Sequence, residues 1–110
     1  MKFAKGDIYL VDLFGQGHEQ QGCRPVIIYS EKNSNIVSII PLTTNKSALK
    51  YHFTYNVKSS KENKLNEDSI ALVFQLRIID YRKIKNKLGN LEEIHLNEID
   101  KQIKDMLKIK

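Results

Sequence analysis

The chain has 110 residues, of which 41% are hydrophobic and 28% charged, with a formal net charge of +5 and a single cysteine. This size and composition predict one ordinary globular domain with a modest core, and they exclude a disordered chain, an internal disulfide and a cysteine-rich metal cage. The basic balance favours polyanionic partners, nucleic acid first, because Lys and Arg neutralise phosphates.

Residues 1–110 contain no linker rich in Gly, Pro or Ser, no internal repeat and no low-complexity tract, which predicts a single domain. No apolar run approaches the ~20 residues of a membrane-spanning helix, so we expect no membrane partner. Charge interrupts residues 1–7 at once, unlike a secretory leader, and we expect a cytoplasmic protein. Cys23 is expected to be a small buried hydrophobe rather than a catalytic thiol.

The first two-thirds of the chain are predicted to form short strands. Residues 7–13 mix β-branched and aromatic side chains and lead into a glycine-containing loop, 14–23. Residues 25–30 form a nearly continuous apolar run, which is typical of a buried strand. The turn-forming residues 31–35 then connect it to a further strand at 36–42, giving a hairpin.

Two more strands are predicted further along the chain. Residues 51–57 alternate in polarity, which places one set of side chains on one side of a strand: Tyr51, Phe53, Tyr55 and Val57. A lysine-rich loop follows at 58–68. Residues 69–79 form the longest apolar stretch, and we predict that they are the central strand.

The C-terminal region changes to a helical period. Apolar residues recur there at intervals of three and four: Leu96, Ile99, Ile103, Met106 and Leu107. Acidic residues near the start and lysines near the end suit the helix dipole. Many short strands followed by one helix predict a mainly β fold, a small and strongly bent antiparallel barrel with the helix packed on it.

Several motifs in the sequence belong together: GDIYLVDL at 6–13, EQQGCRPVII at 19–28, PLT at 41–43 and DSIALVFQLRIID at 68–80. In this order and spacing they resemble the MazF/PemK family of toxins. The helical tail agrees in position and pattern, so the resemblance covers essentially the whole chain.

The resemblance implies an SH3-like, CcdB-like barrel, a symmetric homodimer, and an endoribonuclease toxin of a type II toxin-antitoxin system that cuts single-stranded RNA or mRNA. A separate, MazE-like antitoxin is expected as inhibitor. In this family a 2′-hydroxyl attacks the adjacent phosphate, leaving a 2′,3′-cyclic phosphate and a 5′-hydroxyl, so the resemblance implies no metal and no other cofactor. The catalytic positions that match are Arg24 of the G-x-R-P motif and Thr43 of the P-L-T motif.

The chemistry of these two residues fits such a reaction. Pro25 biases Arg24 toward an extended backbone, and a guanidinium can fork onto phosphate oxygens and stabilise the charge of a phosphorane. The Thr43 hydroxyl can donate to a phosphate oxygen or orient the 2′-hydroxyl, and Thr44 could take this role if the register differs by one. The alternatives are an ordinary surface arginine and a strand-end threonine cap.

Further residues are candidates for RNA contact. Glu19 and Gln20 match the family's E-Q pair in a loop whose glycines suit a mobile flap, although a connector without a ligand role is the alternative. A set of basic residues is a candidate for contact with backbone phosphates, with tyrosines among them as stacking platforms: Lys46, Lys50, Arg82, Lys83, Lys85 and Lys87, with Tyr51, Tyr55 and Tyr81. A solvated basic face is the default for such lysines. No pair of histidines has metal-binding or acid–base spacing.

Gln75 and Arg77 are predicted to face the same side of the long strand, because one residue separates them. Gln75 matches the family's Q-[IL]-R motif, and both are candidates for RNA contact or for a polar pair in a dimer interface. Phe74 replaces an acidic residue that is common in the family, and Ile78 replaces a frequent threonine. These departures bear on specificity more than on catalysis.

Two other functions remain open at this point. A gyrase-poisoning toxin of the CcdB type would act through the C-terminal helix and would not need Arg24 or Thr43, and the intact motifs argue against it. A catalytically silent relative would bind RNA without cutting it, since one misplaced group can remove catalysis while leaving the attraction for phosphate.

Overall fold

One antiparallel sheet of seven strands forms the framework of the computed structural model, which describes residues 2–13, 22–31 and 33–109. The strand order is β4-β5-β3-β2-β1-β7, and β6 also pairs with β3. The strands are β1 (Asp7–Leu13), β2 (Gly22–Ile28), β3 (Ile36–Thr43), β4 (Tyr55–Val57), β5 (Ser69–Ala71), β6 (Arg77–Asp80) and β7 (Ile84–Asn90). The predicted mainly β, antiparallel fold with one C-terminal helix is confirmed, and the described strand pairs run as an open path from β4 to β7.

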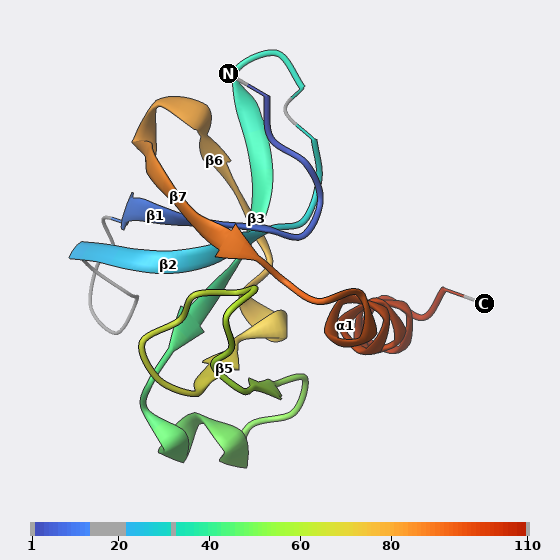
Figure 1. Cartoon of the computed structure of the whole chain (residues 1–110). Helices are drawn as coiled ribbons and strands as arrows, with labels where there is room; N and C mark the ends of the chain where they lie inside the picture. The colour runs from blue at the N-terminus through green and yellow to red at the C-terminus, as the bar shows by residue number, and fades with distance from the viewer. Residues whose placement is uncertain (1, 14–21, 32, 110) are drawn as a thin grey trace.

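Strand β3 connects the two halves of the molecule. Its first half, Ile36 to Ile39, pairs with β6, and its last two residues, Leu42 and Thr43, pair with β5. Figure 1 shows β1, β2, β6 and β7 around the upper part of the view, while β5 and the 3₁₀ helix η1 (Lys46–Lys50) lie at the lower end of β3. The end of β3 therefore leaves the strands of the upper part and pairs with β5 beside η1.

The core lies on both faces of β2, because alternate residues of a strand point to opposite sides. Ile27 is fully buried in one cluster together with Ile40 of β3, whereas Val26 and Ile28 are buried in a second cluster with Phe3. Each buried aliphatic side chain stabilises the fold by about 1.5–3 kcal/mol relative to exposure. Burial on both faces explains why this segment reads as a continuous apolar run.

The helix α1 (Glu93–Met106) covers the first cluster, and in Figure 1 it stands beside the sheet. Ile99 and Ile103 are buried against the sheet, as their spacing predicted. Leu107 differs, because it follows the last helical residue and is exposed. The amphipathic helix is thus confirmed, with one fewer residue on its apolar face.

The prediction of a strand over residues 51–57 is largely wrong, since only Tyr55–Val57 is a strand. Phe53 has a φ of 60°, a left-handed conformation that turns the chain and that alternating polarity does not reveal. Strand β7 was not predicted. It carries polar residues along the edge of the sheet, so it lacks the apolar pattern of a strand.

The single strand predicted over 69–79 is also wrong, because a 3₁₀ helix, η2 (Val73–Gln75), divides it into β5 and β6. Ala71 pairs with Leu42, and Arg77 pairs with Ile39. Two residues of β3 lie between these pairs, whereas five residues, 72–76, connect Ala71 to Arg77. The three extra residues cannot pair with β3, so the segment leaves the sheet as a turn. This turn carries Phe74 and Gln75 out of the sheet.

Candidate active site

Arg24 and Thr43 lie on adjacent strands at the same end of the sheet. Arg24 pairs with Val11 of β1 and is exposed, and Thr43 is half-buried at the end of β3. The register between β2 and β3 pairs Val26 with Pro41, which is the last pair of this ladder, and beyond it Leu42 and Thr43 pair with β5. Arg24 and Thr43 lie two residues beyond this pair on their strands, and alternate residues of a strand share a face, so both belong to the face of Val26 and Pro41.

That shared face is also the face of the second core cluster. Val26 and Ile28 follow Arg24 at alternate positions and are buried in this cluster. Arg77 joins the same face, because it pairs with Ile39, which is buried there. The apolar cluster thus ends in polar side chains at the end of the strands where Arg24 and Thr43 lie.

The Thr43 hydroxyl has a defined local role. Its Oγ1 accepts a hydrogen bond from the backbone N–H of Asn45, 3.2 Å away. A hydroxyl can accept and donate at the same time, so this bond orients the oxygen and leaves its hydrogen available for a ligand. Thr44, the alternative for the same role, is exposed and lines a different pocket together with Pro25.

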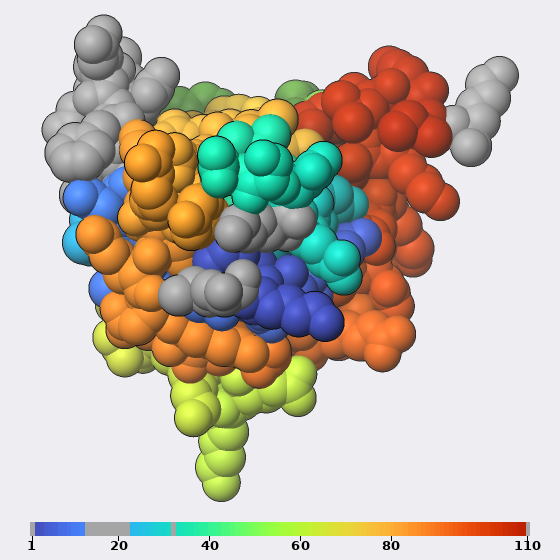
Figure 2. Space-filling model, turned by 90° about the horizontal axis from the view of Figure 1, so that it is seen from above, coloured from blue at the N-terminus to red at the C-terminus, as the bar shows by residue number. Residues whose placement is uncertain are grey.

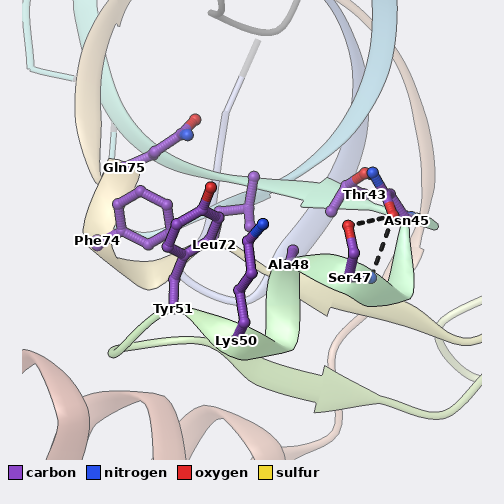
Figure 3. A pocket seen from close by; sticks show the side chains of 9 residues that line it. All are labelled: Thr43, Asn45, Ser47, Ala48, Lys50, Tyr51, Leu72, Phe74 and Gln75. Carbon is purple, nitrogen blue, oxygen red and sulfur yellow. Dashed lines mark hydrogen bonds between the residues drawn. The ribbon is translucent and has the colours of Figure 1, made fainter.

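Thr43 is also part of a pocket of about 440 Å³ between η1 and η2, shown in Figure 3. Its lining residues come from the end of β3, from η1 and from η2: Thr43, Asn45, Ser47, Ala48, Lys50, Tyr51, Leu72, Phe74 and Gln75. The Asn45 Oδ1 accepts hydrogen bonds from the Ser47 backbone N–H and hydroxyl, at 3.1 and 2.8 Å, which caps η1. The pocket therefore combines an apolar floor with a polar rim.

Gln75 lines this pocket, whereas Arg77 is the first residue of β6. The expectation that both share one side of a single strand is wrong, because the boundary between η2 and β6 lies between them. Gln75 thus shares the pocket with Thr43, whereas Arg77 lies opposite Ile39, four residues from Thr43 along β3.

Lys46 lies outside the pocket lining. Its ammonium group donates to the backbone oxygen of Asp68, tying η1 to the start of β5. A hydrogen bond from the Ser59 backbone N–H, together with the charge of Lys46, lowers the pKa of the Asp68 carboxyl below its usual value. These contacts give Lys46 a structural role in addition to any contact with phosphate.

Cys23 is exposed, which corrects the expectation of a buried thiol. It sits near the beginning of β2, where the strand runs past the end of the core, and it pairs with Asp12. Glu19, Gln20 and the predicted flap around them lie outside the described residues.

Sequence reasoning missed Asn45 and Ser47 as members of the pocket, whereas Lys50 was a candidate for phosphate contact. The available signal was the segment TNKS at 44–47, in which Asn followed two residues later by Ser is a typical cap of a helical turn. Within the described ranges, no three His, Cys, Asp or Glu side chains gather where they could hold a metal ion. Over the same ranges, no helix has the length and apolar character needed to cross a membrane.

Comparison with known proteins identifies relatives over almost the full length. A curated protein from Staphylococcus epidermidis, "Endoribonuclease MazF", is 37% identical over 103 residues, covering 87% of this chain and 83% of that protein. The crystal structure of MazF from Deinococcus radiodurans has a TM-score of 0.81 at 21% identity, covering 99% of both chains. An endoribonuclease in complex with its cognate antitoxin, from a mycobacterial species, has a TM-score of 0.69 at 18% identity, covering 97% of this chain and 94% of that one.

The two structural likenesses establish the fold. A family model described as PemK-like, MazF-like toxin of type II toxin-antitoxin system matches residues 4–107. This match includes the segments around Arg24, Thr43 and Gln75. The chain therefore belongs to the PemK-like, MazF-like toxins of type II toxin-antitoxin systems.

Proposed function

We propose that this chain is a toxin that cuts single-stranded RNA, messenger RNA included, as an endoribonuclease, with Arg24 and Thr43 as its catalytic residues. Its relative from Staphylococcus epidermidis carries the name of that activity. The observation that supports the proposal is that Arg24 and Thr43 lie on neighbouring strands, each two residues beyond the Val26–Pro41 pair. The cytoplasm, where messenger RNA is translated, would be its place of action.

The reaction is an intramolecular transfer of a phosphoryl group. The 2′-hydroxyl oxygen of the nucleotide before the cut bonds to the adjacent phosphorus, and the bond from phosphorus to the 5′-oxygen breaks. The 2′-hydroxyl gives up its proton and the departing 5′-oxygen gains one, leaving a 2′,3′-cyclic phosphate and a 5′-hydroxyl. Because the substrate supplies the nucleophile, we propose that cleavage needs neither a metal nor another cofactor.

Arg24 and Thr43 have separate tasks in this reaction. The Arg24 guanidinium pairs with two phosphate oxygens and stabilises the negative charge that builds up on the phosphorane. Its very high intrinsic pKa makes an arginine a poor general base. The Thr43 hydroxyl, held by the Asn45 amide, donates to a phosphate oxygen or orients the 2′-hydroxyl. Thr44, Lys46, Gln75 and Arg77 are proposed to contact RNA nearby.

The test is cleavage of a long, mixed-sequence RNA in EDTA, with analysis of the fragment ends. Wild type is expected to give discrete cuts ending in cyclic phosphate, and Arg24→Ala is expected to lose them. Arg82→Ala is the matched control. It removes the same charge from an exposed arginine, which forms an ion pair with Asp80. Asp80 lies opposite Ile36 at the start of β3, whereas Thr43 is at the other end of that strand.

Two outcomes would contradict the proposal. Intact RNA with wild type would favour the silent RNA-binding relative if the RNA is bound, or the gyrase-poisoning toxin if DNA supercoiling is inhibited instead. Cleavage that survives in Arg24→Ala would keep the nuclease but overturn the assignment of its site.

We also propose a homodimer and inhibition by a cognate, MazE-like antitoxin. A structural neighbour is described as an endoribonuclease in complex with its cognate antitoxin. Strand β6 pairs with β3 alone in the described sheet, and Ile78 on β6 and Ile36 on β3 are 64% and 45% exposed. A sheet edge with exposed apolar residues is suited to pairing with a second chain. Ile78→Lys is expected to shift light-scattering mass from dimer to monomer, whereas an unchanged mass would exclude this edge.

A further inference from the structure

The direction of the Thr43 hydroxyl depends on the residue two positions later in the chain. Thr43 ends β3, where pairing with Ile70 of β5 holds its backbone. This pairing does not by itself choose among the staggered rotamers of the side chain. The hydrogen bond that the Thr43 Oγ1 accepts from the Asn45 backbone N–H, at 3.2 Å, restricts that choice.

Asn45 is in turn fixed by its own side chain, because it forms the N-cap of η1. Its Oδ1 accepts hydrogen bonds from the Ser47 backbone N–H at 3.1 Å and from the Ser47 hydroxyl at 2.8 Å, the dashed lines in Figure 3. Its backbone oxygen accepts from the Ala48 N–H at 3.1 Å. Its backbone is extended, with a φ of −76° and a ψ of 103°, as is usual for an N-cap residue. With its side chain and carbonyl held, Asn45 directs its own N–H toward Thr43.

The short helix η1 is anchored to the strand that pairs with Thr43. Ala48 of η1 is 9% exposed and belongs to a small buried cluster with Ile70 and Leu72. Ile70 is also the residue of β5 that pairs with Thr43. The chain therefore leaves β5 after Thr43 and returns to it at Ala48, and Asn45 lies in the turn between these two points.

We propose that Asn45 is a positioning residue for cleavage. Its side-chain cap orients its backbone N–H, and this N–H holds the Thr43 hydroxyl in the direction that serves the reaction. The hydroxyl hydrogen stays available for the substrate, because Oγ1 acts as the acceptor toward Asn45. Catalysis depends steeply on orientation, and a misplacement of about 1 Å can cost ~10²-fold in rate. The proposal rests on the proposed endoribonuclease function and requires no contact between the Asn45 side chain and RNA.

Three substitutions of Asn45 separate the cap from the amide group. Asn45→Ser keeps a good cap and removes the amide, Asn45→Gln keeps the amide on a longer side chain that is not a preferred cap, and Asn45→Ala removes both. The assay is single-turnover cleavage of an RNA with one mapped cut site over a range of enzyme concentrations. We expect the maximal rate to fall roughly 10- to 100-fold in Asn45→Ala and Asn45→Gln, with the half-saturating concentration nearly unchanged. Asn45→Ser should retain most of the wild-type rate.

A direct contact with RNA would give the opposite pattern. If Asn45→Gln restores activity and Asn45→Ser does not, or if the half-saturating concentration rises while the maximal rate is kept, the amide binds RNA and the positioning role is overturned. A wild-type rate in Asn45→Ala overturns it as well. Because Asn45 is exposed, all three variants are expected to fold, which thermal unfolding checks.

A double-mutant cycle tests whether Asn45 acts through Thr43. In a Thr43→Val background there is no hydroxyl to orient, so adding Asn45→Ala should cause no further loss of rate. An equal loss in both backgrounds would mean that Asn45 acts by another route.

NMR measures the positioning without cleavage. Three-bond couplings from the Thr43 methyl carbon to the backbone nitrogen and carbonyl carbon report its rotamer populations. We expect one dominant rotamer in wild type and Asn45→Ser, and a mixture in Asn45→Ala and Asn45→Gln. An unchanged rotamer in Asn45→Ala, or a mixture at the wild-type rate, would contradict the inference.

The failures of the two proposals are distinguishable. If wild type cuts no RNA while the Thr43 rotamer still responds to Asn45→Ala, the nuclease function fails and the hold of Asn45 on Thr43 stands. If wild type cuts RNA and Asn45→Ala keeps both the rotamer and the rate, the positioning role fails and the nuclease stands.

Discussion

Replacing Thr43 by valine separates the proposed catalytic role of its hydroxyl from its structural one. Valine keeps the β-branched shape at the end of β3 and replaces only the hydroxyl by a methyl group. The hydroxyl oxygen is the atom that accepts a hydrogen bond from the Asn45 backbone N–H at 3.2 Å. That hydrogen bond is exposed, so water can replace it, and we expect the free energy of unfolding to fall by about 0.5–1.5 kcal/mol. The melting temperature should fall by no more than several degrees.

The effect on cleavage should be much larger. Removing one donor that faces the transition state of a reaction lowers kcat by ~10²–10³, equivalent to about 2.7–4 kcal/mol. Thr43→Ser keeps the hydroxyl and should retain most of the activity. The assay is single-turnover cleavage of an RNA containing one mapped cut site, at saturating enzyme, alongside thermal unfolding of each variant. A rate within a few-fold of wild type in a folded Thr43→Val would refute a catalytic role for this hydroxyl.

Three further predictions concern stability. Gly89→Ala places a Cβ 2.6 Å from the backbone oxygen of Asn63, and because backbone cannot move aside cheaply we expect a loss of about 1–3 kcal/mol, measured by urea unfolding. Burial, with a hydrogen bond to Asp100 at 2.6 Å, raises the pKa of Tyr29 above its usual 10.0. Its contribution to stability is therefore complete below pH 10 and lost as the pH rises further, and melting temperatures at pH 8 and 11 should differ less in Tyr29→Phe than in wild type. Burial acts to raise the pKa of Glu92, but hydrogen bonds from nearby side chains outweigh it and lower this pKa below 4.5. The contribution of Glu92 to stability is therefore complete above pH 4.5 and lost as the pH falls. Unfolding measured at falling pH should show a smaller loss of stability in Glu92→Gln than in wild type.

The catalytic candidates were predictable because they lie in compact motifs. Arg24 can be recognised because it precedes Pro25 near the start of a strand, and Thr43 because it ends an apolar strand. Their place on neighbouring strands follows from the hairpin between β2 and β3, which a short turn between two apolar runs already predicts.

The aromatic wall of the pocket was not predictable as a unit. Tyr51 was expected on a strand and Phe74 in the middle of another, where the two would have no reason to meet. In the structure both leave the sheet, Tyr51 after η1 and Phe74 in η2, and their rings come into contact. A surplus of residues opposite β3 causes the second departure, and no local pattern encodes a surplus between two distant segments.

The sequence by itself determined the elements whose burial is periodic: β1, the hairpin of β2 and β3, and the amphipathic helix α1. Local hydrophobic period is sufficient there because each element buries one stripe, or both faces, along its whole length. Only the tertiary structure decided where the apolar run at 69–79 breaks, that Cys23 lies beyond the edge of the core, and that Thr43 shares a pocket with Tyr51 and Phe74. These features depend on strand register and on where the core ends, and both are set by contacts between segments far apart in the chain.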